Sequence, residues 1–174
     1  PSGYELWKSD GTDAGTVHVK GPFRLGNLMN VAGTLYFGAN DEASGSELWK
    51  SDGTEAGTVR VKDINVGVGD SSARYLTNVG GTLFFRANDG IAGEELWKSD
   101  GTEAGTVRVK DIRADAGDAS LLLLTNVGGT LYFVANDGTS GIELWKSDGT
   151  EAGTVRVKDI DPGALSSNLI SLTN

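Results

Sequence analysis

The residue that limits catalytic chemistry in this chain is a single histidine. His18 is the one histidine and there is no cysteine, so disulfides and thiolate metal sites are excluded. Nucleophilic catalysis with a histidine base would have to use His18. The same position of a repeated sequence word is Arg60, Arg108 and Arg156 in the other copies. We therefore interpret His18 as a surface residue of an outer strand.

Pairs of carboxylates offer a second kind of chemistry, hydrolysis by one acidic and one basic carboxyl group. Glu47, Glu95 and Glu143 are candidates, but each lies in the same word of a repeated segment. An active site is normally built once, whereas a residue that recurs in every repeat is typical of a structural role. The sequence therefore predicts that the protein is not an enzyme.

Acidic residues in turns raise the question of calcium. Asp41, Asp89 and Asp137 occupy equivalent positions in Asn-Asp pairs. Calcium prefers about six to eight oxygen ligands, but the chain has no Asp-x-Asp-x-Asp-Gly loop, and Asx-Gly turns form without a metal. We expect turn chemistry here and no cofactor. Weak calcium binding at these three aspartates is the alternative.

Three tryptophans could act as stacking platforms for sugars. Trp49, Trp97 and Trp145 occupy one equivalent position, which would give one platform for each repeat. A tryptophan at a fixed strand position is more often packed between sheets. We therefore expect these side chains to be substantially buried, and ligand stacking is the alternative.

Positions that differ between the copies form another candidate surface. Arg86 lies where the neighbouring copies have Gly38 and Val134, and the connections 65–73 and 113–120 also differ. In repeat proteins, variable loops on one face often form the binding surface. Arg86 is therefore a candidate ligand-binding residue, and neutral variation in an exposed region is the equally weighted alternative.

A repeat of 48 residues must position all of these side chains. The text ELWKSDGTEAGTVRVKDI occurs unchanged three times, and a shorter version opens the chain. Periods of about 20–50 residues mark solenoids, propellers and arrays. We expect a single repeat domain with a partial unit at 1–21, full repeats at 22–64, 65–112 and 113–160, and the start of a further unit at 161–174.

Within a repeat the apolar residues alternate with a period of two, which predicts strands. We expect strands at 122–127, 130–136, 143–147 and 154–158 of the last repeat, with Val155 and Val157 pointing inward. Asp-Gly, Asn-Asp-Gly and Gly-Gly turns separate them. The expected fold class is all-β, a propeller-type array of antiparallel blades with about four strands each.

The repeated words also carry a family resemblance. Glu-Leu-Trp-x-x-Asp-Gly-Thr-x-x-Gly-Thr, found four times, resembles the ELWxxDGT repeats of large bacterial surface and secreted proteins. The resemblance covers nearly the whole chain. It implies a β-propeller-like fold, an extracellular or cell-surface setting in a bacterium, and no established chemistry.

Composition narrows the classes of partner. The 174 residues have a net charge of −9, the opposite of a typical nucleic-acid binder. No apolar run is long enough for a membrane helix, and no glycine-rich nucleotide motif is present. We expect a non-enzymatic binding module for a protein or glycan. The alternatives are a structural unit that assembles with itself and a lectin with one site per blade.

The two ends of the chain suggest an incomplete ring. Together they lack the counterpart of 127–138, which is one central strand of a blade. Three interpretations follow: a fragment of a larger ring, a chain that assembles with other copies, and a closed four-bladed monomer. We expect the terminal segments to pair with another chain, either a second copy or the remainder of a ring, by strand addition.

Overall fold

The computed structural model describes residues 3–40 and 44–173. They form fourteen strands and no helix, so the described part of the chain has no segment that could cross a membrane as a helix. The hairpin sheet contains β1 (Tyr4–Lys8) and β2 (Val17–Phe23), and the second sheet contains β3 (Leu28–Val31), β4 (Thr34–Asn40), β5 (Ser46–Ser51) and β6 (Val59–Lys62). The third sheet contains β7 (Arg74–Val79), β8 (Thr82–Asn88), β9 (Glu94–Ser99) and β10 (Val107–Lys110). The fourth sheet contains β11 (Leu122–Val127), β12 (Thr130–Asn136), β13 (Ile142–Ser147) and β14 (Val155–Lys158).

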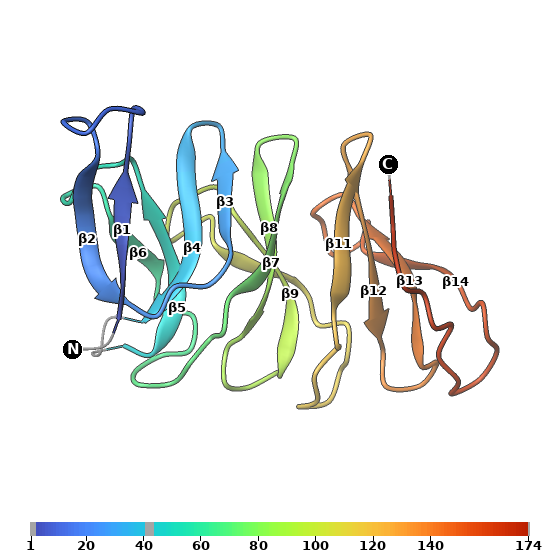
Figure 1. Ribbon diagram of the computed structural model, residues 1–174. Coiled ribbons are helices and arrows are strands. Elements are labelled where there is room, and N and C mark those ends of the chain that lie inside the picture. Colours follow the sequence, from blue (N-terminus) through green and yellow to red (C-terminus); the bar gives the residue numbers. More distant parts are fainter. Residues whose placement is uncertain (1–2, 41–43, 174) are drawn as a thin grey trace.

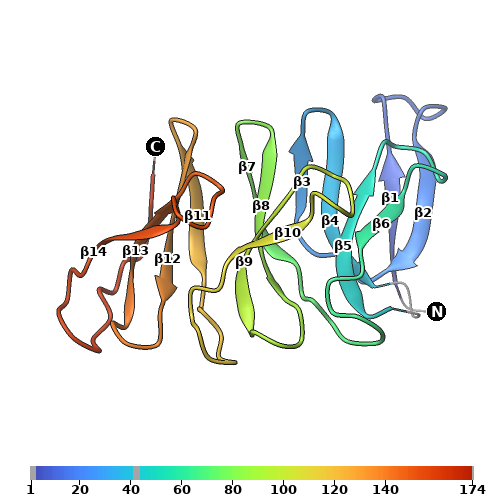
Figure 2. The same ribbon diagram turned by 180° about the vertical axis from the view of Figure 1, so that it is seen from behind.

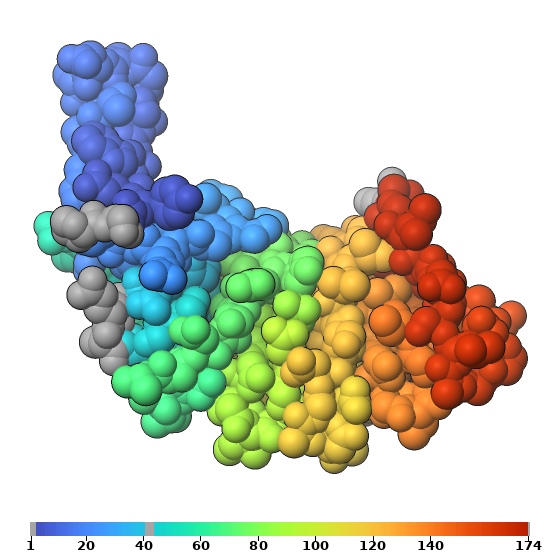
Figure 3. Space-filling model, turned by 60° about the horizontal axis from the view of Figure 1, so that its bottom comes forward, coloured from blue at the N-terminus to red at the C-terminus, as the bar shows by residue number. Residues whose placement is uncertain are grey.

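Each four-stranded sheet is an antiparallel meander, which confirms the expected all-β class and four strands per repeat. The four sheets stand side by side in chain order, with the hairpin sheet and the fourth sheet at opposite ends (Figures 1 and 2). The first strands β3, β7 and β11 contact one another in sequence. A space-filling view shows a curved row from which the hairpin sheet projects at one end (Figure 3).

The repeated word Ser-Asp-Gly-Thr-x-x-Gly-Thr folds into the loop between the last two strands of each sheet. In the fourth sheet, Asp148 Oδ1 accepts hydrogen bonds from Thr150 N at 2.8 Å and Thr150 Oγ1 at 2.7 Å. Gly149 has a φ of 88°, a conformation that favours glycine. A Cβ at Gly153 would collide with the Asp148 side chain. Asx-turn chemistry therefore explains why the word is invariant within this chain.

The core lies between neighbouring sheets, and tryptophan is its repeated element. Trp97 of the third sheet packs in a buried cluster with Tyr36, Leu48, Val61 and Ile64, all but the last of which lie on strands of the second sheet. Trp49 packs in the same way on the hairpin sheet, and Trp145 on the third sheet. Each tryptophan therefore seals the contact between its own sheet and the preceding one.

The outer strands differ from the expected alternation. In β14 the sequence predicts that Val155 and Val157 both point inward, but both side chains are exposed. The pairing of β13 with β14 has an irregularity between Leu144 and Trp145, so that Val157 is an extra residue in the register. Such a bulge resets which side chains face the core. The burial of the second valine then depends on a following sheet, which the fourth sheet lacks in the described residues.

Candidate functional site

The single histidine lies on the surface, as the sequence predicts. His18 is in β2 directly opposite Trp7 of β1, and the two rings meet edge to face at 5.5 Å. His18 is exposed, as are Val17 and Trp7 beside it. The histidine therefore makes one ring contact and, among the described residues, belongs to no group of side chains that could hold a metal ion.

The candidate calcium ligands serve as turn residues. Asp89 and Asp137 each accept hydrogen bonds from backbone N–H groups two and three residues further along the chain, at 2.8–2.9 Å. Each also pairs with an arginine, Asp89 with Arg108 at 3.4 Å and Asp137 with Arg156 at 3.8 Å. Asp41 lies outside the described residues. Within them, no group of three acidic or histidine side chains is arranged for a metal ion.

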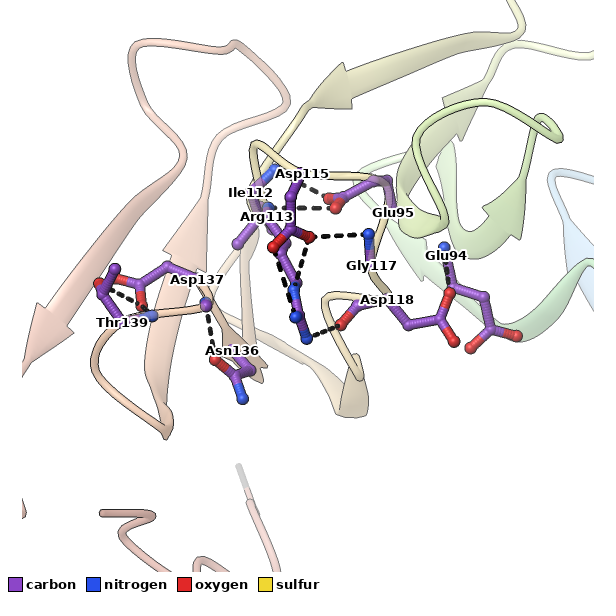
Figure 4. A network of polar contacts seen from close by, with 11 residues as sticks. Glu94, Glu95, Ile112, Arg113, Asp115, Gly117, Asp118, Asn136, Asp137 and Thr139 are labelled. Carbon is purple, nitrogen blue, oxygen red and sulfur yellow. Dashed lines mark hydrogen bonds and ion pairs between the residues drawn. The ribbon is translucent and has the colours of Figure 1, made fainter. Parts of the chain in front are cut away.

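The recurrent glutamates are buried and bind the backbone. Glu47, Glu95 and Glu143 are fully buried. The Glu95 carboxylate accepts hydrogen bonds from Ile112 N at 2.8 Å and Arg113 N at 3.1 Å (Figure 4). Burial raises the pKa of Glu95 to about 7, although the two N–H donors favour its charged form. These carboxylates fix the long connection after each sheet, in keeping with the structural role expected for them.

The variable connection 113–118 satisfies its own polar groups. Arg113 Nε donates to Asp115 Oδ1 at 2.8 Å, and Asp118 Oδ1 accepts from the Glu94 backbone N–H at 2.8 Å (Figure 4). Gly117 N also donates to Asp115 Oδ1, at 2.7 Å. The charged side chains of this connection therefore already have hydrogen-bond partners, so the connection offers little free polar surface.

The three tryptophans proposed as stacking platforms are buried. Trp49, Trp97 and Trp145 are each 6% exposed, which confirms the expected burial. Their rings lie between sheets, so no ring face is open to a sugar. Trp7 differs, because no sheet precedes it among the described residues, and its side chain is 54% exposed.

A cleft of about 750 Å³ is lined by the hairpin sheet, by β4 and β5 of the second sheet and by the start of β7 of the third sheet. Tyr4 and Phe23 line it from the hairpin sheet, and the connection 24–27 crosses its edge. Gly38 of β4 and Tyr75 of β7 also line it. Side chains from three sheets therefore meet at one place, although they are distant in the sequence.

Because Gly38 has no side chain, two other backbone segments approach it closely beside the cleft. Gly26 N of the crossing connection donates to Gly38 O at 2.8 Å, and a Cβ at Gly38 would lie 2.6 Å from Ala73 O. In the next two repeats the same position holds Arg86 and Val134, whose side chains are largely buried. The cleft is thus specific to the second sheet.

Two arginines of the cleft have no anionic partner among the described residues. Arg24 and Arg74 both line the cleft and are exposed. Asp70 is the acidic side chain among its described lining residues, and its Oδ1 accepts a hydrogen bond from Ser46 N at 2.6 Å. The other five of the seven arginines form ion pairs: Arg60, Arg86, Arg108, Arg113 and Arg156. The free arginines are therefore concentrated at one site.

Tyr75, which lines the cleft, is contacted by the side chain of Arg86. Tyr75 has a left-handed φ of 56°, an uncommon conformation for a bulky residue. The Arg86 guanidinium lies 4.8 Å from the centre of the Tyr75 ring, and Arg86 itself pairs with Glu94 at 3.2 Å. Arg86, the ligand-binding candidate from the sequence, therefore has its charge occupied by Glu94 and supports the wall of the cleft.

Sequence reasoning missed Arg24, Arg74 and Tyr75. The signal that marks them is departure from the repeat: Arg74 and Tyr75 stand where the next repeat has Leu122 and Leu123, and Arg24 lies beside a six-residue gap in the first copy. Those departures do not reveal that the three side chains line one cleft, because the segments that carry them are far apart in sequence.

Comparisons with known proteins leave the site without a precedent. The chain matches no family model, no curated protein and no solved structure. The function must therefore be argued from the cleft itself.

Proposed function

We propose that the protein is a non-enzymatic binding module that takes an acidic saccharide in the cleft beside Gly38. The observation that carries this proposal is that Arg24 and Arg74 form no ion pair with any described residue, whereas the other five arginines all do. Guanidinium groups bind carboxylates with two parallel hydrogen bonds. A sugar carboxylate would supply the missing partner.

The shape and lining of the cleft also support a sugar. Small-molecule sites typically have volumes of about 300–1,000 Å³, and this cleft has about 750 Å³. Tyr4 and Tyr75 offer ring faces for the apolar side of a pyranose, while the Asn27 amide offers both a donor and acceptors for its hydroxyls. The ligand class that uses all of these groups is a uronic-acid oligosaccharide.

The charge of the whole chain makes this site distinctive. The net charge of −9 repels anions at long range, so binding must come from the local field of the two arginines. Exposed charges are screened beyond a Debye length of about 8 Å in physiological salt. We therefore expect binding that weakens as salt is added and that requires both arginines.

The wider setting remains part of the proposal. The ELWxxDGT words support a β-propeller-type arrangement of the sheets and an extracellular or cell-surface location in a bacterium, where acidic glycans would be available. A lectin with one site per blade is less well supported, because Trp49, Trp97 and Trp145 are buried. The proposal is one site for the whole chain.

Calorimetric titration with a trigalacturonate tests the proposal. Binding should be measurable with the acid, and its fully methyl-esterified form, which keeps the rings but has no charge, should bind on the order of tenfold or more weakly. Arg24→Ala and Arg74→Ala should each weaken binding to a similar degree.

The control variant is Arg60→Ala, which removes an arginine that pairs with Asp63 at 3.4 Å outside the cleft. It should leave the affinity unchanged. Equal binding of the acid and its ester, or an equal loss in Arg60→Ala, would contradict the proposal.

A further inference from the structure

Besides the contacts of the first strands, each pair of neighbouring sheets packs through the same two surfaces. The lysine face of one sheet carries a leucine, a valine and two lysines, and it packs on the tryptophan face of the next sheet, which carries the tryptophan and the Asp-Gly-Thr loop. Leu48 and Val61 of the second sheet pack with Trp97 of the third in this way. Leu6 and Val19 of the hairpin sheet pack with Trp49 of the second.

The lysines give these contacts their specificity. Lys50 Nζ donates to Gly101 O of the next sheet at 2.8 Å, and Lys98 Nζ donates to Gly149 O at the same distance. Lys50 and Lys98 are half-buried and bridge neighbouring sheets. A second series donates to the threonine that ends the same loop: Lys20 to Thr58 O, Lys62 to Thr106 O and Lys110 to Thr154 O, at 2.9, 2.9 and 3.1 Å.

The lysine face of the fourth sheet has no sheet against it in the described structure. Val157 is 45% exposed, whereas the equivalent Val61 and Val109 are 7% and 6% exposed. Ile160 is 43% exposed, whereas the equivalent Ile64 and Ile112 are buried. The equivalent valine and isoleucine are therefore buried in the second and third repeats and exposed in the last.

The opposite end of the row has the complementary surface uncovered. Trp7 of the hairpin sheet is 54% exposed, and the loop that follows it has the same hydrogen bonds as its buried counterparts, including Thr12 N to Asp10 Oδ1 at 2.9 Å. The hairpin sheet thus presents a preformed tryptophan face. Figures 1 and 2 show that the hairpin sheet and the fourth sheet, which carry these two surfaces, lie at opposite ends of the row.

Charge complementarity extends to the two uncovered surfaces. Inside the chain, Lys50 and Lys98 lie close enough to Asp100 and Asp148 to help lower the pKa of those carboxyls, after the larger effect of the threonine hydrogen bonds. The uncovered pair has the same charges: Lys146 on the fourth sheet and Asp10 on the hairpin sheet.

We propose that the lysine face of the fourth sheet binds the tryptophan face of the hairpin sheet in a second copy of this chain. Val157 and Ile160 then pack on Trp7 of the second copy. Lys146 Nζ donates to Gly11 O, and Lys158 Nζ donates to Thr16 O. This interface continues the three interfaces already present within the chain and needs no pairing of strand edges.

Such a contact is heterologous, since it joins two different surfaces. Heterologous contacts repeat from copy to copy and produce a ring when the rotation closes, or a filament when it does not. The inference is independent of the proposed saccharide site, because the cleft beside Gly38 is not part of either surface.

Sedimentation of the full chain over a range of micromolar concentrations tests the inference. We expect species larger than the 18.1 kDa monomer. Trp7→Arg and Val157→Glu should each weaken association on the order of 30-fold, as expected for a central aromatic anchor and for a charge placed in an apolar contact.

The matched control is Val155→Glu, in the same strand as Val157. Val155 is 38% exposed, and the equivalent Val59 and Val107 are 38% and 37% exposed even though a sheet follows them. Val155 therefore stays outside the proposed contact, and its substitution should leave association unchanged.

Mixing the two disrupted variants distinguishes this arrangement from any other. The Trp7→Arg chain keeps an intact lysine face and the Val157→Glu chain keeps an intact tryptophan face, so an equimolar mixture should form heterodimers. Unfolding curves establish that both variants are folded.

Three results would overturn the inference. One is a wild-type chain that remains a monomer at every concentration, which would leave the surface to a different occupant. The others are an equal loss of association in Val155→Glu and a mixture that stays monomeric.

Discussion

The third sheet and the hairpin sheet contain the same eight residues, Glu-Leu-Trp-Lys-Ser-Asp-Gly-Thr, with very different surroundings. In the third sheet, Glu95 is fully buried and Trp97 is 6% exposed. In the hairpin sheet, Glu5 is exposed, and its carboxylate accepts a hydrogen bond from Trp7 Nε1 at 3.0 Å. The comparison shows that the surroundings, and not the local sequence, decide what these residues contribute to stability: the tryptophan is buried where a preceding sheet covers it, and Glu95 where the following connection supplies Ile112 N and Arg113 N.

The largest expected effect concerns tryptophan. Trp97→Ala removes a ring that is packed on the second sheet and should lower the free energy of unfolding by about 3–5 kcal/mol. Trp7→Ala removes a half-exposed ring and should cost less than about 1 kcal/mol. Urea unfolding of the two variants at low concentration measures the difference. Equal losses would show that the hairpin sheet is covered in solution.

The second expected effect is a pH dependence from the buried glutamate. Burial raises the pKa of Glu95 from 4.5, the value of a free glutamate, to about 7 in the folded protein, so the folded state binds the proton more tightly. Its contribution to stability is therefore present below pH 4.5 and is lost as the pH rises through 7. The loss in unfolding free energy should be roughly 3 kcal/mol.

Glu95→Gln should remove this dependence, because the glutamine does not ionise. Glu5→Gln, in the same word of the hairpin sheet, should leave the slope unchanged. The measurement is unfolding free energy at several pH values from 4 to 8. A wild-type protein whose stability rises over this range would contradict the sign of the effect.

A smaller effect concerns the close approach of the second and third sheets. Gly38→Ala places a Cβ 2.6 Å from Ala73 O and should destabilise the protein by about 1–3 kcal/mol. Gly26→Ala is the matched control, because its Cβ would lie at an ordinary 3.5 Å from Gly38 O. Thermal unfolding compares the two variants. A tolerated Gly38→Ala would mean that the sheets are more widely spaced.

The smallest expected effect comes from the lysines. Lys98→Met removes a hydrogen bond to Gly149 O at 2.8 Å and should cost about 1 kcal/mol. Lys146→Met alters the same word in the fourth sheet, where no carbonyl partner is present among the described residues, and should be neutral. Parallel chemical denaturation checks both. Equal losses of unfolding free energy in the two variants would show that the Lys98 hydrogen bond does not stabilise the packing of the sheets.

Much of the fold follows from local sequence. The strands expected at 122–127 and 130–136 agree with β11 and β12, because apolar alternation and the Gly-Gly and Asx turns act over a few residues. The hairpin sheet extends to Phe23, two residues past the expected unit boundary at 21. Burial of the equivalent tryptophans also follows, since a residue repeated in every sheet must serve a contact that every sheet makes.

The remaining features depend on how sheets meet and could not be predicted. The bulge beside the tryptophan recurs in all three four-stranded sheets, yet Val61 and Val109 are buried and Val157 is exposed, so the exposure of Val157 reflects the lack of a following sheet, which periodicity does not reveal. The cleft brings Arg24, Gly38 and Tyr75 together from three separate segments of the chain. No local sequence pattern indicates that these segments lie close together. The pairing of terminal segments by strand addition stays a prediction.

The central claim is that the tryptophans of identical words differ in burial because a preceding sheet is present or absent. Hydroxyl-radical footprinting of the wild-type chain, diluted until it is monomeric, tests this claim directly, because each of the four tryptophans lies in a different tryptic peptide. We predict that Trp7 is oxidised several-fold faster than Trp49, Trp97 and Trp145. Equal oxidation rates at all four positions would contradict the account.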